Sequence, residues 1–151
     1  MQAAPKTKRR CLALWRWQAA RGKEPKELGK IGIGMALMGS AFVWLAAGSG
    51  PAPTPILWVV VFHLVLNTGW LYLVPTVNAL FSRAAPMAIT GVMLGAVQFA
   101  VFLGSTISGW LGRFYETMDI SAFWLLHAAF PLTGAAIMWA ARGRLGRVLK
   151  L

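Results

Sequence analysis

The chain has 151 residues, of which 58% are hydrophobic and only 13% are charged, yet it carries 15 Lys and Arg against 4 Asp and Glu. A soluble domain has about 25% charged residues spread over its surface, so this composition excludes an ordinary soluble domain. Nine of the basic residues fall between Lys6 and Lys30, and four more between Arg142 and Lys150. Because these blocks flank apolar runs and do not line one exposed face, they indicate contact with the lipid bilayer and no nucleic-acid binding.

Apolar runs of membrane-spanning length fill the rest of the chain. A helix needs about 20 mostly apolar residues to cross about 30 Å of hydrocarbon. The runs are separated by Pro-rich, Gly-rich or charged segments, and they are continuous where a half-buried strand would alternate. The sequence therefore predicts an all-α membrane protein with about four transmembrane helices, at residues 31–48, 56–81, 87–111 and 120–141.

The distribution of basic residues predicts the orientation of these helices. Cytoplasmic loops of membrane proteins carry an excess of Lys and Arg. The basic segment 1–30, the turn at Arg83 and the basic tail 142–151 are therefore expected inside, and the two intervening loops outside. This predicts a multi-pass protein of the plasma membrane with both termini cytoplasmic. The stretch Cys11–Ala20 is too short to span, and it fits either an interfacial helix or the remnant of a longer helix.

The second predicted helix carries a polar stripe. At about 100° per residue, four of its side chains lie within about 80° of one another, namely His63, Asn67, Trp70 and Asn78. A polar stripe is costly against lipid, so it is expected to face protein or a watery cavity. Together with polar side chains of the third predicted helix, it predicts a polar-lined cavity whose candidate lining residues are His63, Asn67, Trp70, Gln98 and Ser105. For His63, and for His127 in the fourth predicted helix, the alternative is a purely structural hydrogen bond.

Small residues form further stripes at helical spacing. In the first predicted helix Gly32, Ala36, Gly39 and Ala47 share a face. Small residues let helix backbones approach closely inside a bilayer. In the third predicted helix we assign helix packing to Gly91, Gly95, Gly104 and Gly109. The alternative for such faces is a moving interface, where helices slide or rock against one another.

Enzymatic chemistry finds no support in the sequence. Paired carboxylates, a phosphate-binding loop and a His/Cys cluster with metal-ligand spacing are all missing from it, and Cys11 is the single cysteine. We therefore expect no enzyme activity, no cofactor and no metal. The predicted spans also contain no Asp or Glu beside the two histidines, so a proton relay of the usual carboxylate type is not indicated.

A succession of short motifs resembles the proton-dependent oligopeptide transporters of the major facilitator superfamily. The segments that carry this resemblance match the end of helix eight through helix twelve of that family in order, over nearly all of residues 11–145. They are RGKEP at 21–25, LNTGWLYLVP at 66–75, LFSRAAP at 80–86, GSTISG at 104–109, FYETM at 114–118 and FWLLHA at 123–128.

The resemblance implies a family role in proton-coupled uptake of di- and tripeptides across the plasma membrane, by symport. Such transporters have about twelve helices in two halves, with the substrate between them. Here Trp70 stands where the family has a glutamate, and Val97 where it has a tryptophan. We expect a carboxy-terminal part of a peptide-transporter-like protein of a bacterial inner membrane, from a truncated or split gene and inactive alone. Its expected partners are the amino-terminal half or further copies of itself. The alternative is a small standalone membrane protein acting as a structural or accessory subunit.

Overall fold

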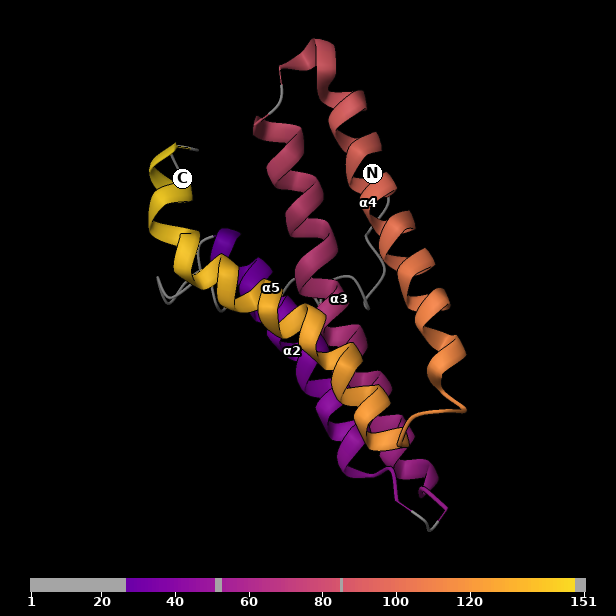
Figure 1. Cartoon of the computed structure of the whole chain (residues 1–151). Helices are drawn as coiled ribbons and strands as arrows, with labels where there is room; N and C mark the ends of the chain where they lie inside the picture. The colour runs from indigo at the N-terminus through magenta and orange to yellow at the C-terminus, as the bar shows by residue number, and fades with distance from the viewer. Residues whose placement is uncertain (1–26, 51–52, 85, 149–151) are drawn as a thin grey trace, which may run out of the picture.

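The computed structural model describes residues 27–50, 53–84 and 86–148. It contains four long helices, shown in Figure 1: α2 (Glu27–Ala47), α3 (Ile56–Ala84), α4 (Thr90–Leu111) and α5 (Ile120–Val148). Short 3-10 helices at Met87–Ile89 and Gly112–Phe114 flank α4. All four long helices have the length and composition to cross a membrane, and the described residues contain no strand. The prediction of a multi-pass, all-α membrane protein with about four helices is confirmed.

Three of the helices are longer than the apolar runs that predicted them. The first begins at Glu27, four residues before the predicted start, the second continues to Ala84, past the predicted end at residue 81, and the last continues to Val148, past the predicted end at residue 141. The extensions of the first and last helices meet at one cluster: Leu28 is buried in it with Ile31 and Leu80, and Leu145 packs against it. Tertiary packing therefore stabilises helical turns that hydropathy alone does not require. The predicted segment Cys11–Ala20, and the basic segment up to residue 26, lie outside the described residues.

The packed part of the bundle consists of α2, α3 and α5, with α2 contacting both of the others extensively. Glycines of α2 allow the short distances between this helix and its two neighbours. A Cβ atom built on Gly34 would lie 2.9 Å from the carbonyl oxygen of Gly69 in α3, and one built on Gly69 would lie 2.7 Å from the carbonyl oxygen of Gly34. On the α5 side, a Cβ on Gly32 would lie 2.7 Å from the indole nitrogen of Trp139. Only glycine permits such close approach of these helices.

Polar and aromatic contacts join the ends of the packed helices. At one end the Trp44 and Trp58 rings stack with centroids 3.9 Å apart, and each indole N–H donates to the other residue's carbonyl, at 3.1 and 2.8 Å. At the other end Arg83 Nη1 lies 2.6 Å from Glu27 Oε1. Because Leu28 and Leu145 meet in one cluster, the first and last described turns lie on the same side of the bundle, as an even number of crossings requires.

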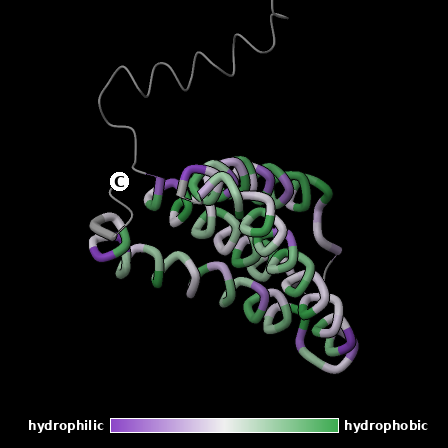
Figure 2. The backbone as a smooth tube through the Cα atoms, turned by 90° about the horizontal axis from the view of Figure 1, so that it is seen from above, coloured by the Kyte–Doolittle hydropathy of each residue, from purple (hydrophilic) through white to green (hydrophobic). Residues whose placement is uncertain are grey.

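Helix α4 stands apart from this packed unit (Figure 1). It contacts α3 over a short stretch, and Leu111 is its one buried residue. Its outward side chains are large and apolar, as in Phe99, Phe102 and Trp110, each more than half exposed within the chain. Figure 2 shows apolar residues along most of the described backbone, with hydrophilic residues gathered mainly toward helix ends. The exposed surface of α4 therefore suits lipid or further helices.

Candidate functional site

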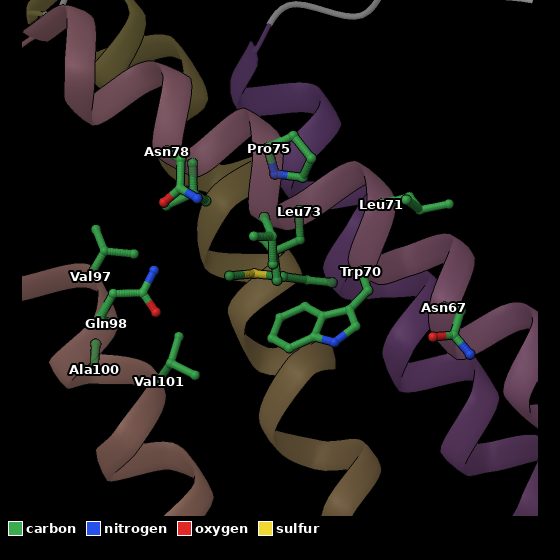
Figure 3. Close-up of a pocket in the computed structure, with 13 residues that line it drawn as sticks. Asn67, Trp70, Leu71, Leu73, Pro75, Asn78, Val97, Gln98, Ala100 and Val101 are labelled. Atoms are coloured by element: carbon green, nitrogen blue, oxygen red, sulfur yellow. The ribbon is translucent and has the colours of Figure 1, made fainter. Parts of the chain in front are cut away.

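A groove of about 780 Å³ lies between α3 and α4. One wall comes from the middle of α3, the other from α4, and Met35 of α2 reaches the floor. The lining is mostly apolar. Its residues are Met35, Asn67, Trp70, Leu71, Leu73, Val74, Pro75, Val77, Asn78, Val97, Gln98, Ala100 and Val101. In Figure 3 Trp70 and Asn78 project from α3 toward the side where α4 presents Gln98 and Val101.

The groove exists because α3 packs on one face only. Leu73 and Val77 of α3 pack against the core cluster, so this face of the helix is held by α2. Trp70 and Asn78 of the polar stripe lie on the side turned toward α4 (Figure 3). Helix α4 diverges from α3 and does not cover this side (Figure 1). Pro75, inside α3, removes one backbone N–H, so the carbonyl of Leu71 loses its usual helical donor beside the groove.

Three of the five candidate cavity-lining residues line this groove: Asn67, Trp70 and Gln98. Asn78, which belongs to the same stripe, lines it as well. Asn67 Nδ2 donates to the carbonyl of His63 at 2.7 Å, one turn back on its own helix. Among the described residues the side chains of Asn78 and Gln98 have no hydrogen-bond partner, and neither has the indole N–H of Trp70, which is 42% exposed.

The other two candidates, His63 and Ser105, do not line the groove. The His63 ring is exposed and contacts Phe62 edge-on, with centroids 5.0 Å apart. Ser105 is exposed on α4. Both are about one to two helical turns from the groove residues of their own helices.

The side chain of His127 contacts the backbone of its own helix, α5, and packs among aromatic rings. Its Nδ1 lies 3.0 Å from the carbonyl oxygen of Phe123. Its ring packs among aromatic rings, with centroid distances of 4.5 Å to Phe123, 5.8 Å to Phe42 and 5.9 Å to Trp124. This arrangement fits the structural alternative for that histidine.

The glycines assigned to helix packing in α4 have no such role among the described residues. A Cβ atom added at Gly91, Gly95, Gly104 or Gly109 would meet no described atom within 4 Å. Close glycine contacts lie instead on α2. Gly32 and Gly39, which belong to the small-residue face identified in the sequence, meet the side chains of Trp139 and Leu132 in α5. Gly34 meets Gly69 of α3, and the sequence analysis did not single out this pair. The α4 glycines are therefore available to a helix that the described chain does not supply.

Among the described residues, none of those that line the groove is charged. Within the described ranges no three His, Cys, Asp or Glu side chains come together in a way that could hold a metal ion. Its described lining is an apolar surface with three carboxamides and an indole, a mixture of groups that is usual in small-molecule sites.

Comparison with known proteins identifies no family for this chain. No protein-family model, no curated protein and no solved structure matches the chain.

Proposed function

We propose that the chain is part of a transporter-like membrane protein, in which the groove between α3 and α4 forms one wall of the substrate path. The observation that carries the proposal is the exposure of α4. This helix is long enough to span a membrane and has one buried residue, and it borders a groove in which the amides of Asn78 and Gln98 have no hydrogen-bond partner among the described residues. A helix of this kind is suited to a larger helical assembly, because polar groups at membrane depth are normally turned toward protein or a water-filled cavity.

The resemblance to proton-dependent oligopeptide transporters supports the same proposal. In that family the role would be uptake of small peptides at the bacterial plasma membrane, driven by protons, with substrate held between two halves. Trp70 and Val97, which occupy two positions characteristic of the family, both line the groove. The chain would act with further transmembrane helices and would be inactive in transport alone.

Site-specific photocrosslinking from α4 tests this proposal. A photoreactive residue at Phe99, which is 59% exposed, is introduced into the chain in its native membrane. The expected product is a crosslink to a second, multi-helix membrane polypeptide encoded next to this chain. A photoreactive residue at Leu28, which is 5% exposed, is the control and should crosslink within the chain. Crosslinks to lipid alone from Phe99 would refute the proposal.

A second candidate function is favoured by the packing of the other three helices. The Gly34–Gly69 contact, the Trp44–Trp58 pair and the Glu27–Arg83 ion pair join α2 to α3. The close approach of Gly32 to Trp139 joins α2 to α5, so the three helices form a closely joined unit. A unit of this kind suits a small standalone protein acting as a structural or accessory subunit. In the same experiment this function predicts that Phe99 crosslinks to a second copy of the chain or to an unrelated membrane protein.

A further inference from the structure

Helix α5 has one face that is exposed over most of its length and ends in an arginine. Residues three or four positions apart share a helix face, and five exposed residues of α5 follow this spacing. They are Phe130, Thr133, Ile137, Ala140 and Arg144. The opposite side of α5 packs on α2, as the close approach of Trp139 to Gly32 shows. The described chain therefore leaves this face, the Arg144 face, uncovered.

The arginine lies at the depth of the lipid headgroups. From Ile120, where the helix begins, to Arg144 the helix rises about 36 Å along its axis, and at least about 31 Å across the membrane for a tilt of up to about 30°. The hydrocarbon core is about 30 Å thick, and the headgroup layers bring the total to about 40–45 Å. With Ile120 at one hydrocarbon boundary, Arg144 lies among the headgroups of the other leaflet, whereas Ile137 and Phe130 lie within the hydrocarbon.

Packing holds Arg144 on a helix and not on a free tail. The next residue, Leu145, packs against the buried cluster that contains Leu28, and α5 continues to Val148. Arg142 lies half a helical turn before Arg144 and is also exposed, so two guanidinium groups lie at nearly the same depth. A guanidinium group presents several N–H donors in a planar fork that suits a phosphate.

The described chain supplies no counter-ion for these two arginines. Among the described residues Glu27 is the acidic residue at this end of the bundle, and its Oε1 lies 2.6 Å from Arg83 Nη1. Neither Arg142 nor Arg144 has a salt-bridge partner in the described ranges. No Asp or Glu follows Asp119 in the sequence. Basic clusters immediately beside a transmembrane helix attract anionic lipids.

We propose that the Arg144 face binds one anionic phospholipid of the leaflet at the basic end of the bundle. Its phosphate is bound by Arg144, and its acyl chain lies along Ile137 and Phe130, which are 60% and 57% exposed within the chain. Arg142 adds to the positive potential at the phosphate. The apolar side chains below the arginine favour a lipid over a soluble anion, because they bury acyl chain. No described residue of α5 lines the groove between α3 and α4, so this inference is independent of the proposed function.

Competition between two phospholipids for the purified chain tests the proposal. The chain in mild detergent is titrated with an equimolar mixture of phosphatidylglycerol and phosphatidylcholine that have identical acyl chains, and the bound lipids are counted by native mass spectrometry. Phosphatidylglycerol carries a net negative charge, and phosphatidylcholine carries none. The chain should prefer phosphatidylglycerol by at least about fivefold, the factor expected from one cation near a headgroup. Equal binding of the two lipids would overturn the proposal.

Substitutions locate the binding on α5. Arg144→Gln should lower the preference by about fivefold, and Arg144→Lys should keep most of it. The matched control is Arg113→Gln at the other end of the bundle, where the guanidinium carbon lies 4.1 Å from the centroid of the Trp110 ring; it should leave the preference unchanged. Circular dichroism verifies that each variant is helical. An unchanged preference in Arg144→Gln, or an equal loss in Arg113→Gln, would overturn the assignment to the Arg144 face.

A photoactivatable phosphatidylglycerol with a diazirine in the middle of one acyl chain tests the apolar half of the site. Peptide mass spectrometry should place its adducts on α5 at or beside Ile137 and Phe130. Adducts confined to the exposed side chains of α4, such as Phe102, would overturn the proposed site. Displacement of phosphatidylglycerol by equal concentrations of inorganic phosphate would overturn a lipid occupant in favour of a soluble anion.

Discussion

The close approach of α2 and α3 makes Gly34→Ala the most informative substitution for the fold. The new Cβ would lie 2.9 Å from the carbonyl oxygen of Gly69 and 3.0 Å from the backbone nitrogen of Leu73. Ordinary van der Waals contact begins near about 3.5 Å, so the backbones must separate by about 0.5 Å. The obstructing atoms belong to the backbone of α3, and no side-chain rotation relieves the clash.

The cost of this separation follows from two opposing effects. Overpacking a close-packed region costs typically about 1–3 kcal/mol. Alanine in place of glycine stabilises the helix by about 0.5–1 kcal/mol, because alanine has the better helix propensity. The difference between these ranges is about 0–2.5 kcal/mol, so we expect Gly34→Ala to lower the free energy of unfolding by about 1 kcal/mol. The measurement is unfolding of the purified chain in mixed micelles of mild detergent and dodecyl sulfate, followed by circular dichroism and tryptophan fluorescence.

Gly95→Ala is the matched control, since a Cβ there would meet no described atom within 4 Å. It should leave stability unchanged or raise it by up to about 1 kcal/mol. A Gly34→Ala variant as stable as the unmodified chain would refute the assignment of the α2–α3 contact. A larger loss for Gly95→Ala than for Gly34→Ala would show that α4 packs closely against another helix, as in a self-associated form.

Reporter fusions at the two ends of the chain are both expected to be active only in the cytoplasm, because Lys and Arg cluster near both ends; an externally active reporter at the carboxy terminus would contradict this orientation. The purified chain in proteoliposomes is expected not to accumulate dipeptides under a proton gradient, because alternating access moves two halves around a shared site. Robust uptake would mean that oligomers of the chain build the cavity. The double substitution Asn67→Leu and Gln98→Leu should leave stability in detergent unchanged or raised, because both side chains are exposed and Asn67 bonds only within its own helix. In a complete transporter the same change should impair transport, whereas a large loss of stability would indicate a self-sufficient four-helix bundle.

The helices were predictable because hydrocarbon thickness imposes a length of apolar sequence that is visible without a structure. The ends of the helices were less predictable. The turns near Glu27 and Leu145 are polar or Gly-rich in sequence, and they are helical because Leu28 belongs to a buried cluster against which Leu145 packs. Contacts between residues more than a hundred positions apart are not contained in a local hydropathy pattern.

The candidate site was predictable in part on both helices: Asn67 and Trp70 of α3 and Gln98 of α4 line the groove, and His63 and Ser105 do not. Helical periodicity alone places Asn67, Trp70 and Asn78 on one side of α3, and the structure turns that side toward a groove. Which residues of α4 face the groove depends on how the two helices diverge, so Gln98 lines it and Ser105 does not. The same dependence explains the glycines: packing geometry brings Gly34 against Gly69 and leaves Gly95 open.

The equal lengths of α3 and α4 have a consequence for the bilayer in which the chain resides. With its two 3-10 turns, the apolar helical span of α4 covers 28 residues, Met87–Phe114, and the apolar span of α3, Ile56–Arg83, also covers 28. Each is about 42 Å long, so in a hydrocarbon layer of about 30 Å both must tilt or project into the headgroups. Because the two helices diverge from the turn that joins them (Figure 1), they tilt in different directions. The angle between them, and with it the width of the groove, therefore depends on membrane thickness.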